Sequence, residues 1–386
     1  MPERENVMRN RFTASVIALV LVLFSVSCGV HSPVGSSHTE IDGLTFIERA
    51  KHSYAEGFSI DRYENGFSLI TTKDGRFLIV PEGKDIPENL DGDITPLRQP
   101  VDNIYLAATA DMTFFDKLGA LGAIRFSSVK KDDWYIDSAK AAMESGEIIY
   151  AGKYREPDYE LLLGEGCTLS IQSTMIDHTP EVKEKLEELG ITVFTDYSSY
   201  ESHPLGRSEW VKVYGEMTGK SEEAEELFKE QEQKLAGISE TADKKSVAFF
   251  YINNAGQICV RKSDDYISKM LELAGGENVF NGVKQQGGSA SFPIDAEQFY
   301  TLAKDADVLI YNTSLGGNPA NVQELIGKYA LLAEFKAVKE SNVWCTSGSL
   351  FQETLSSGAI IGDFHNAFYG GDTEYVTHLR EGDAVE

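Results

Sequence analysis

The sequence predicts an α/β protein with two lobes, each a mostly parallel sheet flanked by helices, joined by a single long helix. The first observation is that strand-like and helix-like segments alternate between residues 103 and 195, a pattern typical of parallel sheets. The second is that the alternation resumes between residues 247 and 346. The third is a run without Gly or Pro, residues 222–235, between the two patterns. A chain of 386 residues is long enough for two such lobes.

The first lobe is predicted from residues 41–205, and its clearest unit is a helix followed by a strand. Thr179 and Pro180 are typical of a helix start, and Gly190 is typical of the position after a helix end. Earlier in the lobe, residues 58–80 alternate like strands and contain the turn sequences NG and DG, so we expect a β-rich extension there. The predicted strands of the regular part are residues 103–108, 123–127, 147–150, 169–171 and 191–195, with helices at residues 112–118 and 136–144.

A linking helical segment is predicted at residues 206–243. Residues 221–243 carry eight acidic and two basic side chains, which favours a solvated helix face over a binding site. About 20 helical residues span roughly 30 Å, the diameter of a small lobe. The second lobe is predicted from residues 244–386. Its expected elements are residues 247–252, 267–273, 297–303, 308–311, 322–326 and 343–346.

Charge and composition exclude several classes of protein. With 35 basic and 61 acidic side chains the formal net charge is −26, whereas nucleic-acid binding needs a basic surface. The fractions of hydrophobic (42%) and charged (25%) residues are those of an ordinary globular protein. We therefore expect an acidic globular protein that does not bind nucleic acid, rather than a disordered chain or a multi-span membrane protein.

The first 27 residues are predicted to be a signal peptide for export. Nine consecutive apolar residues, 16–24, follow three arginines, and this run is too short for a typical membrane span. Residues 25–28, SVSC, resemble a bacterial lipobox, although Ser25 stands where such a box usually has Leu. We expect lipidation of Cys28, with residues 28–40 as a flexible tether, and the alternative is plain secretion. The expected location is the outer face of the cytoplasmic membrane, or the periplasm.

The sequence lacks the motifs of common catalytic and cofactor sites. It has no phosphate-binding P-loop, no GxGxxG after a strand, no GxSxG nucleophile elbow and no HExxH. None of the seven histidines has the spacing of a metal site. Cys167, Cys259 and Cys345 are far apart, which favours buried thiols over disulfides or zinc ligands. We expect a protein that is not an enzyme and holds no cofactor or metal.

A ligand is expected at the carboxyl ends of the strands, where open α/β sheets bind their ligands. In the first lobe these loops contain Tyr154, Tyr197 and Tyr200, and in the second they lie next to Tyr251 and Tyr311. Flat aromatic rings suit a large, partly apolar ligand, although each ring is at least as compatible with packing between sheet and helices. Nearby guanidinium groups can pair with anionic groups of a ligand. They belong to Arg155, Arg207 and Arg261.

Four stretches share the recurring patterns of one family. Residues 152–160, GKYREPDYE, are similar to a Gly-rich loop followed by Pro-Asn-x-Glu, with Asp158 in place of the Asn. Residues 180–193 are similar to a helix ending in Leu-Gly-Ile before a strand, and residues 210–220 to the segment entering a linking helix. The fourth stretch lies in the second lobe. It comprises AGGEN at residues 274–278, DAE at residues 295–297 and AVK at residues 337–339.

In this order and spacing, the stretches resemble the substrate-binding lipoproteins of ABC importers for iron complexes and cobalamin, a class with two lobes joined by one long helix. The resemblance covers about residues 100–370 and leaves residues 58–80 outside. It implies a monomer that closes its lobes on a ligand and then docks on a permease with its ATPase. It also implies that Glu160 and Glu297 pair with permease arginines, although both positions also suit a first-turn acid favoured by the helix dipole.

The resemblance leaves the ligand open. A ferric siderophore or another iron chelate fits the aromatic loops with nearby arginines. A corrinoid or haem is the alternative, since a Tyr or His can ligate haem iron. An extracytoplasmic sensor that uses the same two lobes is the alternative of another class.

Overall fold

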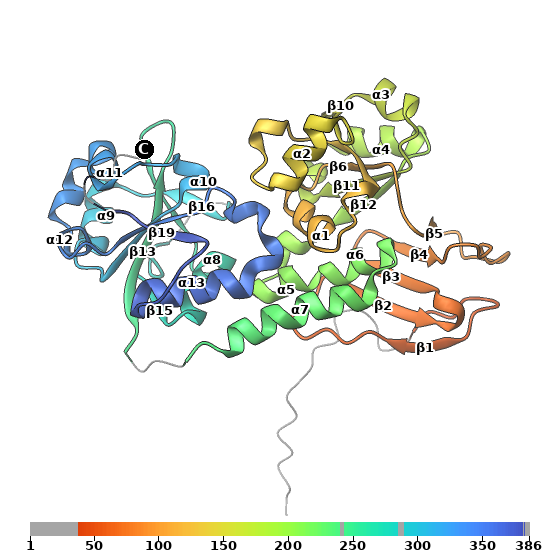
Figure 1. Cartoon of the computed structure of the whole chain (residues 1–386), viewed down its shortest axis with the longest axis horizontal. Helices are drawn as coiled ribbons and strands as arrows, with labels where there is room; N and C mark the ends of the chain where they lie inside the picture. Colours follow the sequence, from red (N-terminus) through yellow and green to blue (C-terminus); the bar gives the residue numbers. More distant parts are fainter. Residues whose placement is uncertain (1–37, 240–242, 285–288, 381, 383–386) are drawn as a thin grey trace, which may run out of the picture. The chain divides into compact units, whose positions relative to one another are not determined.

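The computed structural model describes residues 38–239, 243–284, 289–380 and 382, and it contains two α/β sheets with helices on their faces (Figure 1). This confirms the predicted fold class. The predicted signal peptide and Cys28 lie outside the described residues. Within the described part, no helix combines the length and the hydrophobicity that crossing a membrane requires.

The first lobe is built on a five-stranded sheet in the order β12-β11-β6-β7-β8, and every pairing in it is parallel. Its strands face a core on both sides: Ile171 packs on one face of the sheet and Val193 on the other. The strands are β6 (Ile104–Leu106), β7 (Ile124–Ser127), β8 (Ile149–Tyr150), β11 (Leu169–Ser173) and β12 (Thr192–Asp196). The helices are α1 (Met112–Lys117), α2 (Asp137–Ser145), α3 (Tyr159–Gly164) and α4 (Pro180–Glu188).

Two local features of the first lobe follow from its sequence. Pro180 opens α4, and Gly190, two residues after its last residue, has a φ of +80°, which confirms the predicted start and end of this helix. After β8 a short hairpin pairs β9 (Gly152–Lys153) with β10 (Glu156–Pro157). This hairpin leaves Tyr154 and Arg155 at its tip.

The second lobe is built on a mixed sheet in the order β16-β14-β13-β17-β18-β19, with β15 also paired to β13. The predicted parallel core is present, but β14, β16 and β19 pair antiparallel. For β14 the reason lies in the turn after β13, where Asn253 Oδ1 accepts the backbone N–H groups of Ala255 and Gln257, and so short a turn can only join antiparallel strands. The strands are β13 (Lys245–Ile252), β14 (Ile258–Arg261), β15 (Gly276–Asn278), β16 (Ser291–Pro293), β17 (Val308–Tyr311), β18 (Val343–Thr346) and β19 (Val376–His378).

Helices cover the faces of the second sheet. A core on one side surrounds Phe299 of α9, and a core on the other surrounds Phe364 of α13. The helices are α8 (Tyr266–Leu273), α9 (Ala296–Ala303), α10 (Thr313–Gly316), α11 (Val322–Lys328), α12 (Lys336–Lys339) and α13 (Ser357–Tyr369).

Ahead of the first lobe, residues 46–98 form a separate five-stranded sheet, which we call the extension. The predicted NG turn is present, because Asn65 and Gly66 have φ values of 62° and 84° between its second and third strands. One face of the extension joins the core of the first lobe through side chains such as Phe58 and Phe77. The other face has a small core of its own around Leu69. The strands are β1 (Phe46–Arg49), β2 (Phe58–Tyr63), β3 (Ser68–Thr72), β4 (Arg76–Val80) and β5 (Ile94–Arg98).

The link between the lobes consists of three consecutive helices, where the sequence predicted one. They are α5 (Pro204–Glu209), α6 (Val211–Thr218) and α7 (Ser221–Ala236). Gly219, with a φ of +73°, ends α6, and α7 then covers the predicted run 222–235. The two helices fold closely against each other, since a Cβ added at Gly215 would lie 2.5 Å from the Cβ of Ala224.

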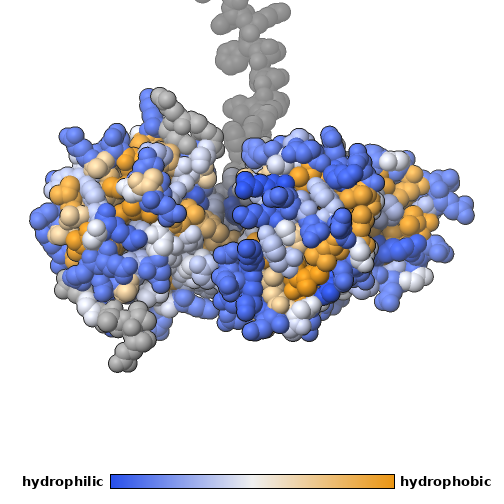
Figure 2. All heavy atoms as spheres, turned by 90° about the horizontal axis from the view of Figure 1, so that it is seen from above, coloured by the Kyte–Doolittle hydropathy of each residue, from blue (hydrophilic) through white to orange (hydrophobic). Residues whose placement is uncertain are grey.

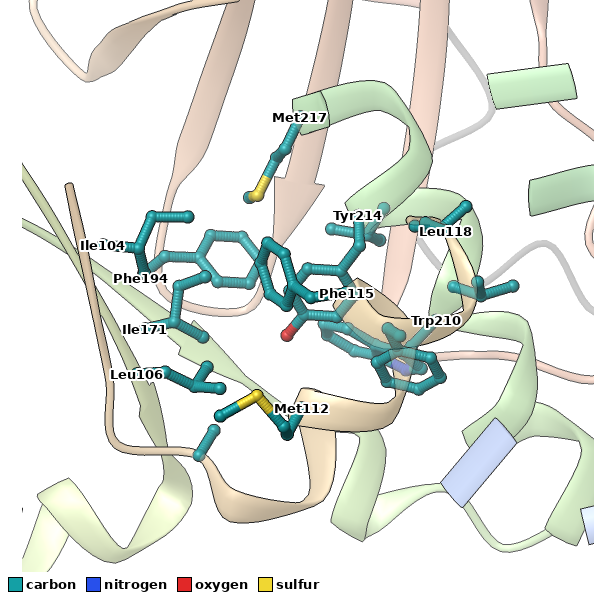
Figure 3. Packing of buried hydrophobic residues seen from close by; sticks show 14 of the residues in the cluster. Ile104, Leu106, Met112, Phe115, Leu118, Ile171, Phe194, Trp210, Tyr214 and Met217 are labelled. Atoms are coloured by element: carbon teal, nitrogen blue, oxygen red, sulfur yellow. The ribbon is translucent and has the colours of Figure 1, made fainter. Parts of the chain in front are cut away.

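The linking helices pack on both lobes. Trp210, Tyr214 and Met217 enter the core of the first lobe, where they meet Phe115 of α1 and Phe194 of β12 (Figure 3). On the other side, α7 lies against α13 of the second lobe. Nothing wider than a glycine fits at that crossing, because a Cβ added at Gly358 would lie 2.3 Å from the carbonyl oxygen of Gln231.

Two buried glutamates fasten the extension to the first linking helix and to the loop just before it. The Glu209 carboxylate accepts the backbone N–H groups of three successive residues, 53–55, at 2.8 to 3.1 Å. It also lies 3.1 Å from the Lys212 ammonium, itself buried. The Glu201 carboxylate accepts the next two N–H groups, at residues 56 and 57. A segment that lacks regular secondary structure is thereby held at five backbone positions.

Candidate functional site

A cavity of about 490 Å³ lies at the carboxyl ends of β6, β7 and β8, where the sequence predicted a ligand. Tyr150 and Tyr154 contribute aromatic rings to its wall, and Lys130 and Lys153 contribute ammonium groups. Gln352, from the second lobe, completes the lining. The cavity is therefore built by both lobes, as a cleft that closes on a ligand requires.

Gln352 is a direct link between the lobes. Its side-chain oxygen accepts the backbone N–H of Tyr135 at 2.8 Å, and its side-chain nitrogen donates to the carbonyl of Asp133 at 2.9 Å. The Tyr135 ring also lies against Gly348 of the second lobe, where an added Cβ would come within 2.6 Å of a ring carbon. The loop after β7 is thus held against the loop after β18 by two hydrogen bonds and a ring contact, and we call this contact the clasp.

Two of the predicted arginines meet at one aromatic ring next to this clasp. The guanidinium carbon of Arg207, on α5, lies 3.9 Å from the centre of the Tyr266 ring, and that of Arg261, on β14, lies 5.7 Å from it. Arg261 also lies 5.5 Å from the ring of Phe351, the residue before Gln352. Arginines from the linking helices and from the second lobe are therefore brought together, as an anion-binding role needs.

One carboxylate partly balances these arginines. Asp265 Oδ1 lies 2.9 Å from Arg261 Nε, in an ion pair without good hydrogen-bond geometry, and it accepts the backbone N–H of Ile267 at the start of α8. Burial raises the pKa of Asp265, and the guanidinium of Arg261 lowers it. With two guanidinium groups and one carboxylate at Tyr266, positive charge prevails there.

The remaining first-lobe candidates separate into three environments. Tyr154 lines the cavity, whereas Arg155 is exposed at the hairpin tip. Tyr197 is buried, and its ring lies 5.4 Å from the ammonium of Lys73 in the extension. Tyr200 is 73% exposed. Of these four residues, the structure places only Tyr154 in the cavity wall.

The two second-lobe tyrosines differ from each other. Tyr251 is half-buried, and its hydroxyl lies 2.9 Å from Ser291 Oγ on β16, two strands away in the sheet. Tyr311 is fully buried, and its hydroxyl donates to the carbonyl of Gly316 at 2.7 Å. The prediction that Tyr311 contacts a ligand is therefore wrong. Its ring fills the core between sheet and helices, which is the alternative that the sequence left open.

Several exposed large hydrophobic side chains lie at the carboxyl ends of the strands. The face in Figure 2 is mostly hydrophilic, with separate hydrophobic patches. Among the large hydrophobic residues that stay exposed, Tyr135, Met175 and Tyr200 follow strands of the first lobe, and Leu315 follows β17 of the second. A ligand with apolar parts would cover such residues in the cleft.

A buried trio of polar groups lies beneath this edge of the first lobe. The Tyr214 hydroxyl oxygen is 2.6 Å from Asp111 Oδ2 and 2.8 Å from Asp196 Oδ2. A phenol has one proton and can donate to only one of them, so the second contact requires a proton on a carboxyl group. Burial and the nearby Asp196 raise the pKa of Asp111 well above its ordinary value, and burial raises the pKa of Asp196 to about 6.

The other sequence predictions concern cysteines and metals. Cys167, Cys259 and Cys345 are free and buried, as predicted. In the part of the chain that the structure describes, no three His, Cys, Asp or Glu side chains come together as a metal site. His203, beside the linking helices, has a structural position, since its Nδ1 accepts the backbone N–H of Leu205 at the start of α5.

The deciding comparison is with protein families. A model described as periplasmic binding protein matches residues 108–348. The chain belongs to this periplasmic binding protein family. Membership makes it the solute-binding component of an ABC importer and not an enzyme. The match begins after the extension, as the sequence resemblance does.

Relatives and solved structures agree with this assignment. Two uncharacterized lipoproteins of Methanocaldococcus jannaschii are similar to this binding protein. The first is 24% identical, and the alignment covers 78% of this chain and 77% of the relative. The second is 23% identical, and the alignment covers 97% of this chain and 100% of the relative. The second alignment therefore takes in the extension as well.

Solved structures show the same fold at low identity. A periplasmic binding protein from Veillonella parvula has a TM-score of 0.58 at 17% identity, covering 71% of this chain and 93% of its own. A periplasmic heme binding protein from Pseudomonas aeruginosa has a TM-score of 0.56 at 18% identity, and the match covers 73% of this chain and 100% of that protein. An ABC-type Fe3+-hydroxamate transport system from Saccharomonospora viridis has a TM-score of 0.52 at 19% identity, and the match covers 71% of this chain and 94% of that protein.

The two predicted docking glutamates occupy matching places in this binding protein. Glu160 lies in the first turn of α3 and Glu297 in the first turn of α9, and both are exposed. Each helix leads into a parallel strand of its own lobe, β11 or β17. Neither carboxylate has a cation within 4.0 Å among the described residues, so both are available to an external partner.

Proposed function

We propose that this protein is an exported lipoprotein that captures an iron complex, such as a ferric siderophore, between its lobes and delivers it to an ABC permease. The observation that carries the proposal is the cavity built by both lobes, with aromatic rings in its wall and the Arg207 and Arg261 pair beside it. Aromatic rings suit the flat organic part of a chelate, and cations suit its anionic groups.

The surroundings of the cavity support a ligand that is larger than the cavity itself. A volume of about 490 Å³ lies within the usual range for small-molecule sites. Exposed apolar residues such as Tyr200 and Leu315 extend the edge of each lobe beyond it. A chelate with aromatic arms would fill the cavity with one part and cover these residues with another.

Haem is the second candidate, and Tyr150 and Tyr154 favour it. Both phenols line the cavity, and a tyrosine oxygen can ligate haem iron. A corrinoid has the same flat shape and shares the supporting observations of size and aromatic lining.

Delivery is assigned to Glu160 and Glu297. We propose that each carboxylate pairs with an arginine of the permease, one at each lobe. Exposed charges on a docking surface speed encounter and fix orientation more than they add affinity. Attachment to the outer face of the membrane is assigned to Cys28, and the lipoprotein names of the two archaeal relatives support it.

Thermal unfolding with a ligand panel tests the proposal. The panel contains a ferric tricatecholate, a ferric trihydroxamate, haem and cobalamin, and each metal-free chelator serves as a control. A ligand that binds only the folded protein at 100 times its Kd stabilises it by about 2.7 kcal/mol, a clear rise in Tm. A rise with an iron complex supports the proposal, a rise with haem or cobalamin alone selects the alternative, and no rise with any of them contradicts both.

A further inference from the structure

Two lysines line the cavity, although the chain as a whole is strongly acidic. Lys130 follows β7 and Lys153 lies on the β9–β10 hairpin, so they approach the cavity from separate segments. No carboxylate of the described residues lies within 4.0 Å of either ammonium. By contrast Lys131, next in the chain, lies 3.7 Å from Glu144. The cavity therefore holds two cationic groups that the protein itself does not neutralise.

Lys130 is accompanied by an aromatic ring, and Lys153 has a tyrosine as its neighbour in the chain. The Lys130 ammonium lies 5.7 Å from the centre of the Tyr150 ring, and Tyr154 follows Lys153 directly on the hairpin. An ammonium over a ring keeps its hydrogen-bond donors available, because the ring accepts charge and not a conventional hydrogen bond. Both ammonium groups can therefore donate to anionic oxygens of a ligand.

The lysines and the arginine pair lie on opposite sides of one short segment. Gln352 lines the cavity with the lysines, while Phe351, one residue earlier, faces Arg261. The segment therefore has the two cavity lysines on one side and the buried Arg261 on the other. The carboxylates near them are fewer: Asp133 lines the cavity, and Asp265 pairs with Arg261.

We infer that the binding protein selects for ligand charge and takes a multiply anionic iron chelate in preference to an uncharged one. This inference rests on the proposed function and makes it narrower, since an uncharged chelate of the same size gains nothing from the two lysines that line the cavity. Lys130 and Lys153 contact the anionic oxygens of the ligand, since they line the cavity, whereas Arg207 and Arg261 add positive charge without lining it. A net charge of −26 would repel such a ligand without this local excess of positive charge.

Titration with two iron complexes tests the inference. The probes are a trianionic ferric tricatecholate and an uncharged ferric trihydroxamate, followed by quenching of intrinsic fluorescence at low and high salt. We expect the wild-type protein to bind the tricatecholate at least tenfold more tightly, and raised salt to weaken that complex alone. Lys130→Gln and Lys153→Gln should each weaken tricatecholate binding at least fivefold and leave trihydroxamate binding unchanged.

Two variants serve as matched controls. Lys131→Gln removes the same charge from the adjacent residue, which does not line the cavity, and should leave tricatecholate binding within twofold of wild type. Asp133→Asn removes the carboxylate from the cavity lining and should strengthen tricatecholate binding. Equal affinity for the two probes, or a loss in Lys131→Gln as large as in Lys130→Gln, overturns the inference while the proposed function stands. Binding of neither probe overturns the proposed function itself.

Discussion

The buried Asp111, Tyr214 and Asp196 trio predicts a specific loss of stability as the pH rises. Each aspartate is almost inaccessible to solvent, and the geometry requires one shared proton in the folded protein. In the unfolded chain both carboxyl groups lose their protons near pH 3.8. Because the folded pair holds a proton that the unfolded chain has released, raising the pH favours the unfolded state.

The magnitude follows from the proton count. One extra proton bound by the folded state lowers the free energy of unfolding by about 1.4 kcal/mol for each pH unit. Asp111→Asn removes this dependence, because an amide is shaped like the protonated carboxyl group and can donate to the Tyr214 oxygen without titrating. The variant should match the wild-type protein near pH 4 and exceed it by a margin that grows with pH.

Urea unfolding at a series of pH values from about 4 to 7 measures this margin as the difference between variant and wild type. Taking the difference cancels the many exposed carboxylates, which titrate in both proteins. Asp85→Asn, at an exposed position of the extension, is the control and should show no growing margin. A constant difference between Asp111→Asn and wild type across the series would mean that the trio holds no proton, and the reasoning would be refuted.

Three further predictions concern separate parts of the molecule. Glu209→Ala should lower the free energy of unfolding by about 3–5 kcal/mol in urea titrations, because it strands three backbone N–H groups and removes one of the two carboxylates that pair with the buried Lys212; a loss no larger than in the exposed Glu226→Ala would contradict it. Gln352→Ala should weaken, several-fold by calorimetry, the binding of whichever ligand raises the Tm in the panel, because it removes the two hydrogen bonds of the Gln352 side chain to the first lobe. Unchanged affinity would exclude a role of Gln352 in closure. Glu160→Ala combined with Glu297→Ala should leave that affinity intact but abolish uptake in cells, and normal uptake would disprove the docking assignment.

Much of the fold could be predicted because its signals are local. Pro180 and Gly190 delimit a helix through backbone preferences that need no distant partner, and the Asn65-Gly66 turn follows from the left-handed backbone that these residues tolerate. The antiparallel strand β14 was missed, since it depends on how the Asn253 side chain bonds its own turn. The division of the link into three helices was also missed, because the run 222–235 is by itself long enough to predict a single linking helix.

The site could be predicted only in part, because ligand contact depends on tertiary placement. Sequence position located Tyr154 in a loop that lines the cavity, but the same rule selected Tyr311, whose ring is buried in the core. Lys130 and Lys153 gave no signal along the chain, since a lysine in a loop is ordinarily solvated. Tyr266 was overlooked because its contact with Arg207 and Arg261 arises only from the tertiary structure.

The extension determines which lobe a membrane anchor restrains. Its sheet shares a core with the first lobe, and Glu201 and Glu209 fix it to the linking helices, so a pull on the tether is transmitted to these parts together. The second lobe is connected to them through α7 and its packing on α13. In a protein anchored at Cys28, Glu160 would stay near the membrane at a high effective concentration, while Glu297 would search a wider volume. If docking uses both glutamates as proposed, the anchored lobe would make first contact and the second lobe would complete it.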